Sequence, residues 1–230
     1  MIRAVFFDLD GTLVDTEPLH FAAYNVALSE VGVQISHAEY FARFIGYNDH
    51  DCFAAVLREN RRDASETRIA TLIATKHTAF ERLMSSGRDV IYPGAAEFVR
   101  QCHARFPLMI VTGALRVEAE QALTATGLRG YFLDVIAAED VERGKPEGDG
   151  FVAALGRIGF LLRQRDPVMP AECLVVEDTP AGIEAAHRAG MRALAVGHTG
   201  DAPRLDAADF FSPSFGAIDL DALLQTIARS

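Results

Sequence analysis

Two carboxylates near the beginning of the chain are the side chains best suited to chemistry. An apolar run over residues 4–7 ends in Asp8 and Asp10, and Gly11 and Thr12 follow directly. Residues i and i+2 of an extended chain point the same way, so both acids should lie side by side at the end of a buried strand. Paired carboxylates repel unless a cation or a shared proton intervenes, and Mg²⁺ prefers oxygen ligands. The alternative is a surface turn, because Asp-Gly is common there.

Two further apolar runs also end in polar groups. One ends in Thr112 and Gly113, whose hydroxyl and backbone N–H groups suit phosphate oxygens. The other ends in Glu177 and Asp178, and Lys145 lies between the two runs in the chain. A lysine near carboxylates can neutralise charge on a transferring phosphoryl group. Taken singly, each group is also common at turns, helix starts or protein surfaces.

Together these residues resemble four sequence motifs of the haloacid dehalogenase superfamily. The stretch Asp-Leu-Asp-Gly-Thr-Leu at 8–13 is similar to the first motif, and Thr112, Lys145 and Asp178 match the later three in order. The segment 148–150 departs from the commoner continuation of the third motif. The resemblance covers nearly the whole chain.

The resemblance assigns a role to each matched residue. Asp8 is the expected nucleophile, which forms an aspartyl phosphate, and Asp10 the expected general acid and base. Thr112, Gly113 and Lys145 are expected to bind and stabilise the phosphoryl oxygens. We expect these groups to act together on one phosphate.

The resemblance also implies a metal site. Mg²⁺ is the expected cofactor, held by Asp8, by the backbone carbonyl of Asp10 and by Asp178. Glu177 is a weaker candidate that would lie just outside the ligand set.

The implied function is a Mg²⁺-dependent phosphatase that hydrolyses a small phosphorylated metabolite, such as a sugar phosphate. Dehalogenases and phosphonoacetaldehyde hydrolases lack an acid at the position of Asp10. The main alternative is a sugar phosphomutase of the β-phosphoglucomutase type, which uses an arginine where this chain has Asp49, with Arg43 or Arg58 as substitutes to consider. A receiver-like domain and a catalytically inactive binding module are further alternatives, disfavoured by the helical insert and by the complete motifs.

Five residues outside the core motifs are candidates for substrate specificity. His20 and Lys76 match a histidine and a lysine of β-phosphoglucomutase, and Gly46 matches a glycine of its cap loop. Tyr47 and Asn48 follow this glycine on a loop that could reach the substrate. The alternative is a histidine and a surface lysine without a catalytic role.

The spacing of apolar residues divides the chain into two parts. Residues 15–87 show helical spacing and helix-capping residues such as Thr16 and Ser36, which predicts an all-helical cap. Residues 1–14 and 88–230 alternate strands with helices, which predicts an α/β fold with a Rossmann-like parallel sheet. We expect helices over 16–32, 36–46, 49–59, 65–84, 93–105, 117–126, 150–162, 181–189 and 220–228, and strands over 4–7, 108–111, 135–136, 173–176 and 193–196.

Composition limits the partners and the compartment. The chain has 230 residues, half of them hydrophobic, and a net charge of -10, which disfavours nucleic acid as a partner. No apolar run approaches the roughly 20 residues of a membrane helix, so we expect a cytoplasmic protein without a membrane partner. Cys52, Cys102 and Cys173 show no pairing pattern and should be buried thiols. The oligomeric state stays open.

Overall fold

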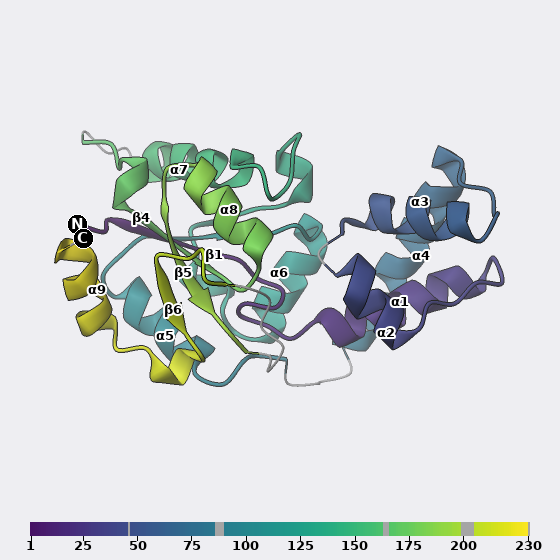
Figure 1. Ribbon diagram of the computed structural model, residues 1–230, viewed down its shortest axis with the longest axis horizontal. Helices are drawn as coiled ribbons and strands as arrows, with labels where there is room; N and C mark the ends of the chain where they lie inside the picture. The colour runs from purple at the N-terminus through teal and green to yellow at the C-terminus, as the bar shows by residue number, and fades with distance from the viewer. Residues whose placement is uncertain (46, 86–89, 163–165, 199–204, 230) are drawn as a thin grey trace. The chain divides into compact units, whose positions relative to one another are not determined.

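The computed structural model describes residues 1–45, 47–85, 90–162, 166–198 and 205–229 (Figure 1). The chain forms two compact units. One unit, which we term the core unit, comprises Met1–Asp15 and Val90–Ser230, and the other, the helical unit, comprises Thr16–Asp89.

The core unit is built on a parallel sheet whose described strands have the order β3-β2-β1-β4-β5-β6. The strands are β1 (Ala4–Phe7), β2 (Leu108–Val111), β3 (Asp134–Ile136), β4 (Cys173–Glu177), β5 (Arg192–Val196) and β6 (Phe210–Ser212). The order changes direction at β1, which pairs with β2 on one side and β4 on the other. Ligands of open α/β sheets bind beyond the carboxyl ends of the strands at such a point. The predicted α/β fold with a Rossmann-like sheet is confirmed.

Helices cover both faces of this sheet (Figure 1). They are α5 (Ala95–His103), α6 (Arg116–Ala125), α7 (Asp149–Leu162), α8 (Pro180–Arg188) and α9 (Leu220–Arg229). Phe6 of β1 belongs to a buried cluster with Phe151 of α7, whereas the ring centroid of Phe7 lies 6.0 Å from that of Phe98 on α5. Successive strand residues therefore reach opposite apolar layers, which explains why β1 is apolar throughout.

Strand β6 was missed by the sequence prediction. It has three residues and pairs only with β5 among the described strands, at the edge of the sheet. Phe211 in its middle is 58% exposed. A short edge strand needs no continuous buried run, so it lacks the pattern that marks the central strands.

The helical unit contains α1 (Glu17–Ser29), α2 (His37–Glu39), a π-helix (Tyr40–Phe44), α3 (Asp49–Glu59) and α4 (Glu66–Met84). Helix α1 packs along α4, and the unit has an apolar cluster of its own. The single helix expected over 36–46 is instead a short α-helix that continues as the π-helix. Ser36 caps α2 as expected, with its Oγ accepting the N–H of Glu39.

The predicted capping role of Thr16 is wrong. Its backbone has φ -97° and ψ -10°, close to helical values, and its side chain makes no capping hydrogen bond. A capping residue normally has extended dihedrals, which aim its oxygen at the free N–H groups of the first turn. Pro18 lies in the first turn of α1, where its missing N–H costs no helical hydrogen bond.

Two further features concern the chain as a whole. Cys52, Cys102 and Cys173 are free and buried, as predicted. Among the helices of the described ranges, none combines the length and apolar character needed to cross a membrane.

Candidate active site

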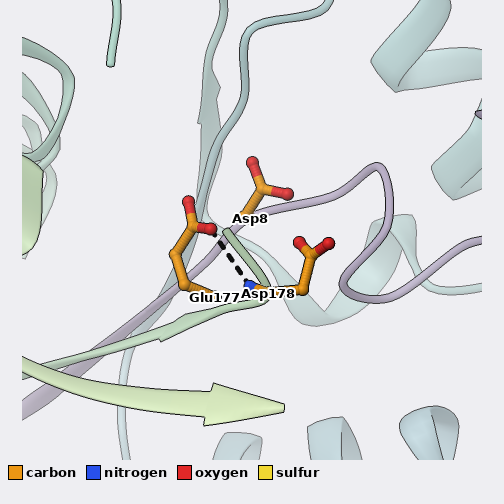
Figure 2. Close-up of side chains that lie close together, drawn as sticks. All are labelled: Asp8, Glu177 and Asp178. Carbon is orange, nitrogen blue, oxygen red and sulfur yellow. Dashed lines mark hydrogen bonds between the residues drawn. The ribbon is translucent and has the colours of Figure 1, made fainter. Parts of the chain in front are cut away.

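Three carboxylates meet where β1 and β4 end (Figure 2). Asp8 follows β1, Glu177 is the last residue of β4, and Asp178 comes next. The N–H of Asp8 donates to the carbonyl of Val176 at 3.0 Å, which ties the two strand ends together. One carboxylate oxygen from each of the three acids lies within 4.8 Å of the other two. Segments about 170 residues apart in the sequence thus form one acidic cluster because parallel strands end at the same edge.

Lys145 is the cation of this cluster. Its Nζ forms an ion pair with Asp8, lies 2.5 Å from Oε1 of Glu177, and donates to the carbonyl of Val111 at 3.2 Å. It also lies 5.6 Å from the centre of the Phe151 ring. The lysine predicted from the third motif therefore bridges the ends of three strands.

Burial, with neighbouring negative charge as a further cause, raises the pKa values of two acids in this cluster. Burial raises the pKa of Asp8 to about 7, and the charge of Glu177 adds to this while that of Lys145 opposes it. Burial also raises the pKa of Asp178, with the charges of Glu177 and Asp8 adding to the rise. Burial would lower the pKa of Lys145, but Asp8 and Glu177 outweigh it and raise this pKa. Three acids around one lysine favour an added cation, and their oxygen donors fit a divalent metal ion.

Two glycines make room for the acids. A Cβ at Gly11 would lie 2.5 Å from the Asp178 carboxylate, and φ at Gly11 is +83°, which disfavours other residues. A Cβ at Gly182, in the first turn of α8, would lie 1.8 Å from the Glu177 carboxyl carbon. The motifs therefore need glycine at these positions for close packing around the site.

Glu177 has a second set of contacts at the start of α8. Its Oε2 accepts the N–H groups of Asp178 and Thr179, each at 3.1 Å, and the hydroxyl of Thr179 at 2.9 Å. The Thr179 oxygen in turn accepts the N–H of Gly182 and caps α8. Glu177 thus connects Lys145 to the beginning of this helix.

Asp10 and Thr112 lie beside each other at the ends of β1 and β2. The Thr112 hydroxyl donates to Oδ2 of Asp10 at 3.4 Å and accepts the N–H of Ala114 at 3.0 Å. Thr112 is buried and Asp10 half-buried, whereas Gly113 is exposed with open space where a Cβ would be. Their placement leaves the first two motifs adjacent, as the parallel pairing of β1 with β2 requires.

The departure at 148–150 has a packing reason. A Cβ at Gly148 would lie 2.9 Å from the backbone N of Ala189, and one at Gly150 would lie 2.8 Å from the side chain of Val111. Between them, Asp149 accepts two hydrogen bonds from the Arg143 guanidinium, at 2.9 and 3.0 Å. These glycines let the segment after Lys145 approach α8 and β2 closely.

His20 and Lys76 lie within the helical unit and share a neighbour. The His20 ring stacks on Phe80 with centroids 4.3 Å apart, and Lys76 Nζ lies 5.4 Å from the same ring. Lys76 is 1% exposed and lies 3.1 Å from Oδ1 of Asp49, which also accepts the Tyr24 hydroxyl at 2.6 Å. The alternative of a surface lysine is therefore wrong for Lys76, because α1, α3 and α4 bury it.

The remaining specificity candidates differ from one another. Asn48 caps α3: its side chain accepts the N–H of Asp51 at 2.9 Å and donates to the Asp51 carboxylate at 2.8 Å. Tyr47 is 52% exposed and meets Phe44 edge-on. Gly46 lies outside the described residues.

Sequence comparison places the chain in a family. The family described as haloacid dehalogenase-like hydrolase matches residues 2–190. The chain therefore belongs to the haloacid dehalogenase-like hydrolases, as its motifs indicated.

Several individual proteins and solved structures are similar to this chain. Fructose-1-phosphate phosphatase YqaB of Escherichia coli (strain K12) is 33% identical over 193 residues, covering 84% of this chain and 95% of the relative. Protein CbbY of Rhodobacter capsulatus is 32% identical over 202 residues, with 84% of each chain covered. The crystal structure of CbbY from Rhodobacter sphaeroides with phosphate aligns with a TM-score of 0.80 and 28% identity over 94% of this chain and 95% of that one. A β-phosphoglucomutase from Clostridium difficile shares the fold, with a TM-score of 0.85, 21% identity and coverage of 100% and 98%.

Proposed function

We propose that this chain is a Mg²⁺-dependent phosphatase that hydrolyses a small phosphorylated metabolite through an aspartyl phosphate on Asp8. The observation that carries the proposal is the cluster of three carboxylates within 4.8 Å of one another, with Lys145 paired to the acid that would attack. An excess of acids over cations suits a site that binds a metal ion.

The proposed reaction has two displacements. A carboxylate oxygen of Asp8 attacks phosphorus while the bond to the ester oxygen breaks, and Asp10 gives its proton to the departing oxygen. Asp10 then takes a proton from water, whose oxygen attacks the same phosphorus and releases inorganic phosphate and the Asp8 carboxylate. Thr112, the N–H of Gly113 and Lys145 hold the phosphoryl oxygens and offset their charge.

Asp8, Asp178 and the carbonyl of Asp10 would hold the Mg²⁺ ion. When bound, the ion would offset the repulsion between the Asp8 carboxylate and the anionic phosphate. We assign Glu177 to hold Lys145 and the start of α8, because both of its oxygens face these groups.

The class of substrate is proposed from the relatives. YqaB is named for fructose 1-phosphate, and a relative from Streptomyces hygroscopicus subsp. limoneus, 30% identical over 217 residues, is named validoxylamine A 7'-phosphate phosphatase. These names support a phosphorylated carbohydrate or a similar phosphomonoester. We assign substrate selection to the helical unit, with the exposed Tyr47 as the leading candidate, because His20, Lys76 and Asn48 make contacts within that unit.

The phosphomutase alternative uses the same core residues and differs in needing a cation for a second phosphate. Asp49 stands at the position of the expected arginine. It lies 3.1 Å from Lys76, and its negative charge compensates the positive charge of this lysine. Arg43 pairs with Glu39 and Glu59, and Arg58 is exposed. The Asp49–Lys76 pair supports hydrolysis over phosphoryl transfer between two positions of a sugar.

The test is a panel of phosphorylated metabolites incubated with Mg²⁺, with both released phosphate and isomerised product measured. We expect phosphate release from at least one sugar phosphate, abolished by a chelator and by Asp8→Asn. Glucose 1-phosphate with a bisphosphate activator serves as the mutase assay. Faster formation of glucose 6-phosphate than of free phosphate would reject the phosphatase proposal in favour of the mutase alternative. No turnover of any ester by folded, Mg²⁺-loaded protein would reject both.

A further inference from the structure

His198 lies outside the motifs described above, yet it contacts the segment that carries the first of them. Its ring stacks on Tyr92 with centroids 3.8 Å apart and an interplanar angle of 7°, and it lies 5.2 Å from the Phe215 ring. Its Nε2 lies 2.9 Å from the carbonyl oxygen of Thr12. A carbonyl can only accept, so Nε2 carries the proton and donates. The two aromatic contacts fix the plane in which this N–H points.

The turn after β1 needs this donor. The carbonyls of Leu9, Leu13 and Val14 all accept backbone N–H groups, at 2.8 to 3.1 Å. Thr12 is 0% exposed, so its carbonyl requires a partner within the protein. The His198 side chain supplies that partner.

The side chain of Thr12 reaches the acidic cluster. Its hydroxyl donates to Oδ1 of Asp178 at 2.6 Å. The bond fixes one oxygen of a half-buried carboxylate whose other contacts include the charges of Asp8 and Glu177. The orientation of Asp178 therefore depends on where the Thr12 backbone is held.

We propose that His198 is a positioning residue for the metal site: by holding the Thr12 carbonyl, it aims the Thr12 hydroxyl at Asp178 and so sets the affinity for the divalent ion. This role rests on the proposed function of the acidic cluster as a metal site. Partners one step beyond metal ligands typically change metal affinity by roughly 10 to 100-fold.

Two substitutions separate the hydrogen bond from the ring. His198→Phe keeps an aromatic ring against Tyr92 and Phe215 but loses the donor, whereas His198→Gln keeps an N–H donor and loses the ring. His103→Phe is the matched control. His103 lies on α5, and it likewise contacts a backbone carbonyl, that of Tyr131 at 3.0 Å, and an aromatic ring, that of Tyr131 edge-on.

The measurement is the dissociation constant for Mg²⁺ alone, obtained by calorimetric titration of the full chain, together with the thermal midpoint of each metal-free variant. We expect His198→Phe to weaken Mg²⁺ binding on the order of tenfold. His198→Gln should stay within about twofold to threefold of the unsubstituted protein, and His103→Phe should match it. Thr12→Val should weaken binding similarly, and its combination with His198→Phe should add little, because both act on one chain of contacts.

Other outcomes would overturn the inference. Unchanged Mg²⁺ affinity in His198→Phe, or full additivity with Thr12→Val, would show that His198 does not act through Thr12. Equal weakening in His198→Gln and His198→Phe, in proportion to their loss of thermal stability, would make His198 a purely structural residue. If the unsubstituted protein does not bind Mg²⁺, the proposed metal site itself fails, which this design reveals before any variant is compared.

Discussion

Each unit of the chain pairs a lysine with an acid, but the two lysines meet different surroundings: Lys145 is half-buried and Lys76 is buried. In the core unit, Lys145 pairs with Asp8 and Glu177, and Asp178 lies in the same cluster. In the helical unit, Lys76 pairs with Asp49 and lies 5.4 Å from the Tyr24 and Phe80 rings. Acids outnumber the lysine in the first case, whereas in the second the contacts of Lys76 include Asp49 and two aromatic faces.

This difference separates a binding site from a structural contact. Burying like charges together costs free energy unless a ligand compensates for them, and such stored repulsion is typical of functional sites. A buried pair of opposite charges compensates for itself, and its main requirement is that both partners stay. We therefore expect the core cluster to respond to ligands and the helical pair to respond mainly to loss of a partner.

The largest expected effect is on the nucleophile. Asp8→Asn should lower kcat for an aryl phosphate with Mg²⁺ by about 10⁴-fold or more, because an amide cannot form the aspartyl phosphate. Its metal-free form should melt no lower than the unsubstituted protein, since removing a carboxylate whose burial disfavours its charge, next to Glu177, offsets the loss of the ion pair with Lys145. Measurable turnover in a preparation free of contaminating phosphatase would remove Asp8 as the nucleophile.

The second prediction compares the lysines directly. Lys145→Met and Lys76→Met should each lower the free energy of unfolding by about 3 kcal/mol, because the first leaves the buried Asp8 and Glu177, and the second the half-buried Asp49, without this cation. Denaturant unfolding with and without Mg²⁺ distinguishes them: the ion should restore much of the stability of Lys145→Met and little of that of Lys76→Met.

The catalytic activities of the same two variants should also differ. Lys145→Met should lose aryl phosphate hydrolysis, whereas Lys76→Met should keep it within about threefold, because Lys76 is assigned no part in the chemical step. If Lys76 also selects the substrate, its removal should reduce turnover of the natural substrate more than that of the aryl phosphate. Equal losses on both substrates would exclude a role in specificity.

A smaller effect concerns the glycines. Gly182→Ala should destabilise the protein by about 2 kcal/mol, since its Cβ would overlap the Glu177 carboxylate and displace it from Lys145. Gly156→Ala in α7 is the control, because a Cβ there meets nothing within 4 Å. It should stabilise the protein by about 0.5 to 1 kcal/mol, as expected for alanine inside a helix. Equal thermal midpoints for the two variants would contradict the tight packing at Glu177.

The smallest effect is the pH dependence of metal binding. The pKa of Asp8 is raised from 3.8 to about 7 in the folded protein, so its contribution to metal-free stability is greatest below pH 4 and is lost as pH rises through 7. Mg²⁺ must displace this proton, so its binding should strengthen by about tenfold, or about 1.4 kcal/mol, between pH 6 and pH 8. Thermal shifts at fixed Mg²⁺ measure the gain, and a larger shift at pH 6 than at pH 8 would contradict it.

The sequence alone determined the central strands and the residues at their ends. Asp8, Thr112 and Glu177 each follow a continuous apolar run directly, with Asp178 next in the chain, and parallel strands must bring their carboxyl ends to one edge. That geometric rule, together with the motif order, was sufficient to predict that distant segments meet at one site.

Several contacts in this protein are encoded by no local pattern and depend on how the elements pack. The Thr12–Asp178 and His198–Thr12 hydrogen bonds join residues 166 and 186 positions apart, and the Asp49–Lys76 pair depends on how α3 packs against α4. The spacing of apolar residues predicts which face of an element is buried, but it does not predict which polar side chain contacts that face. Hydrogen bonds and ion pairs depend on distance and direction, and these are set when the elements pack.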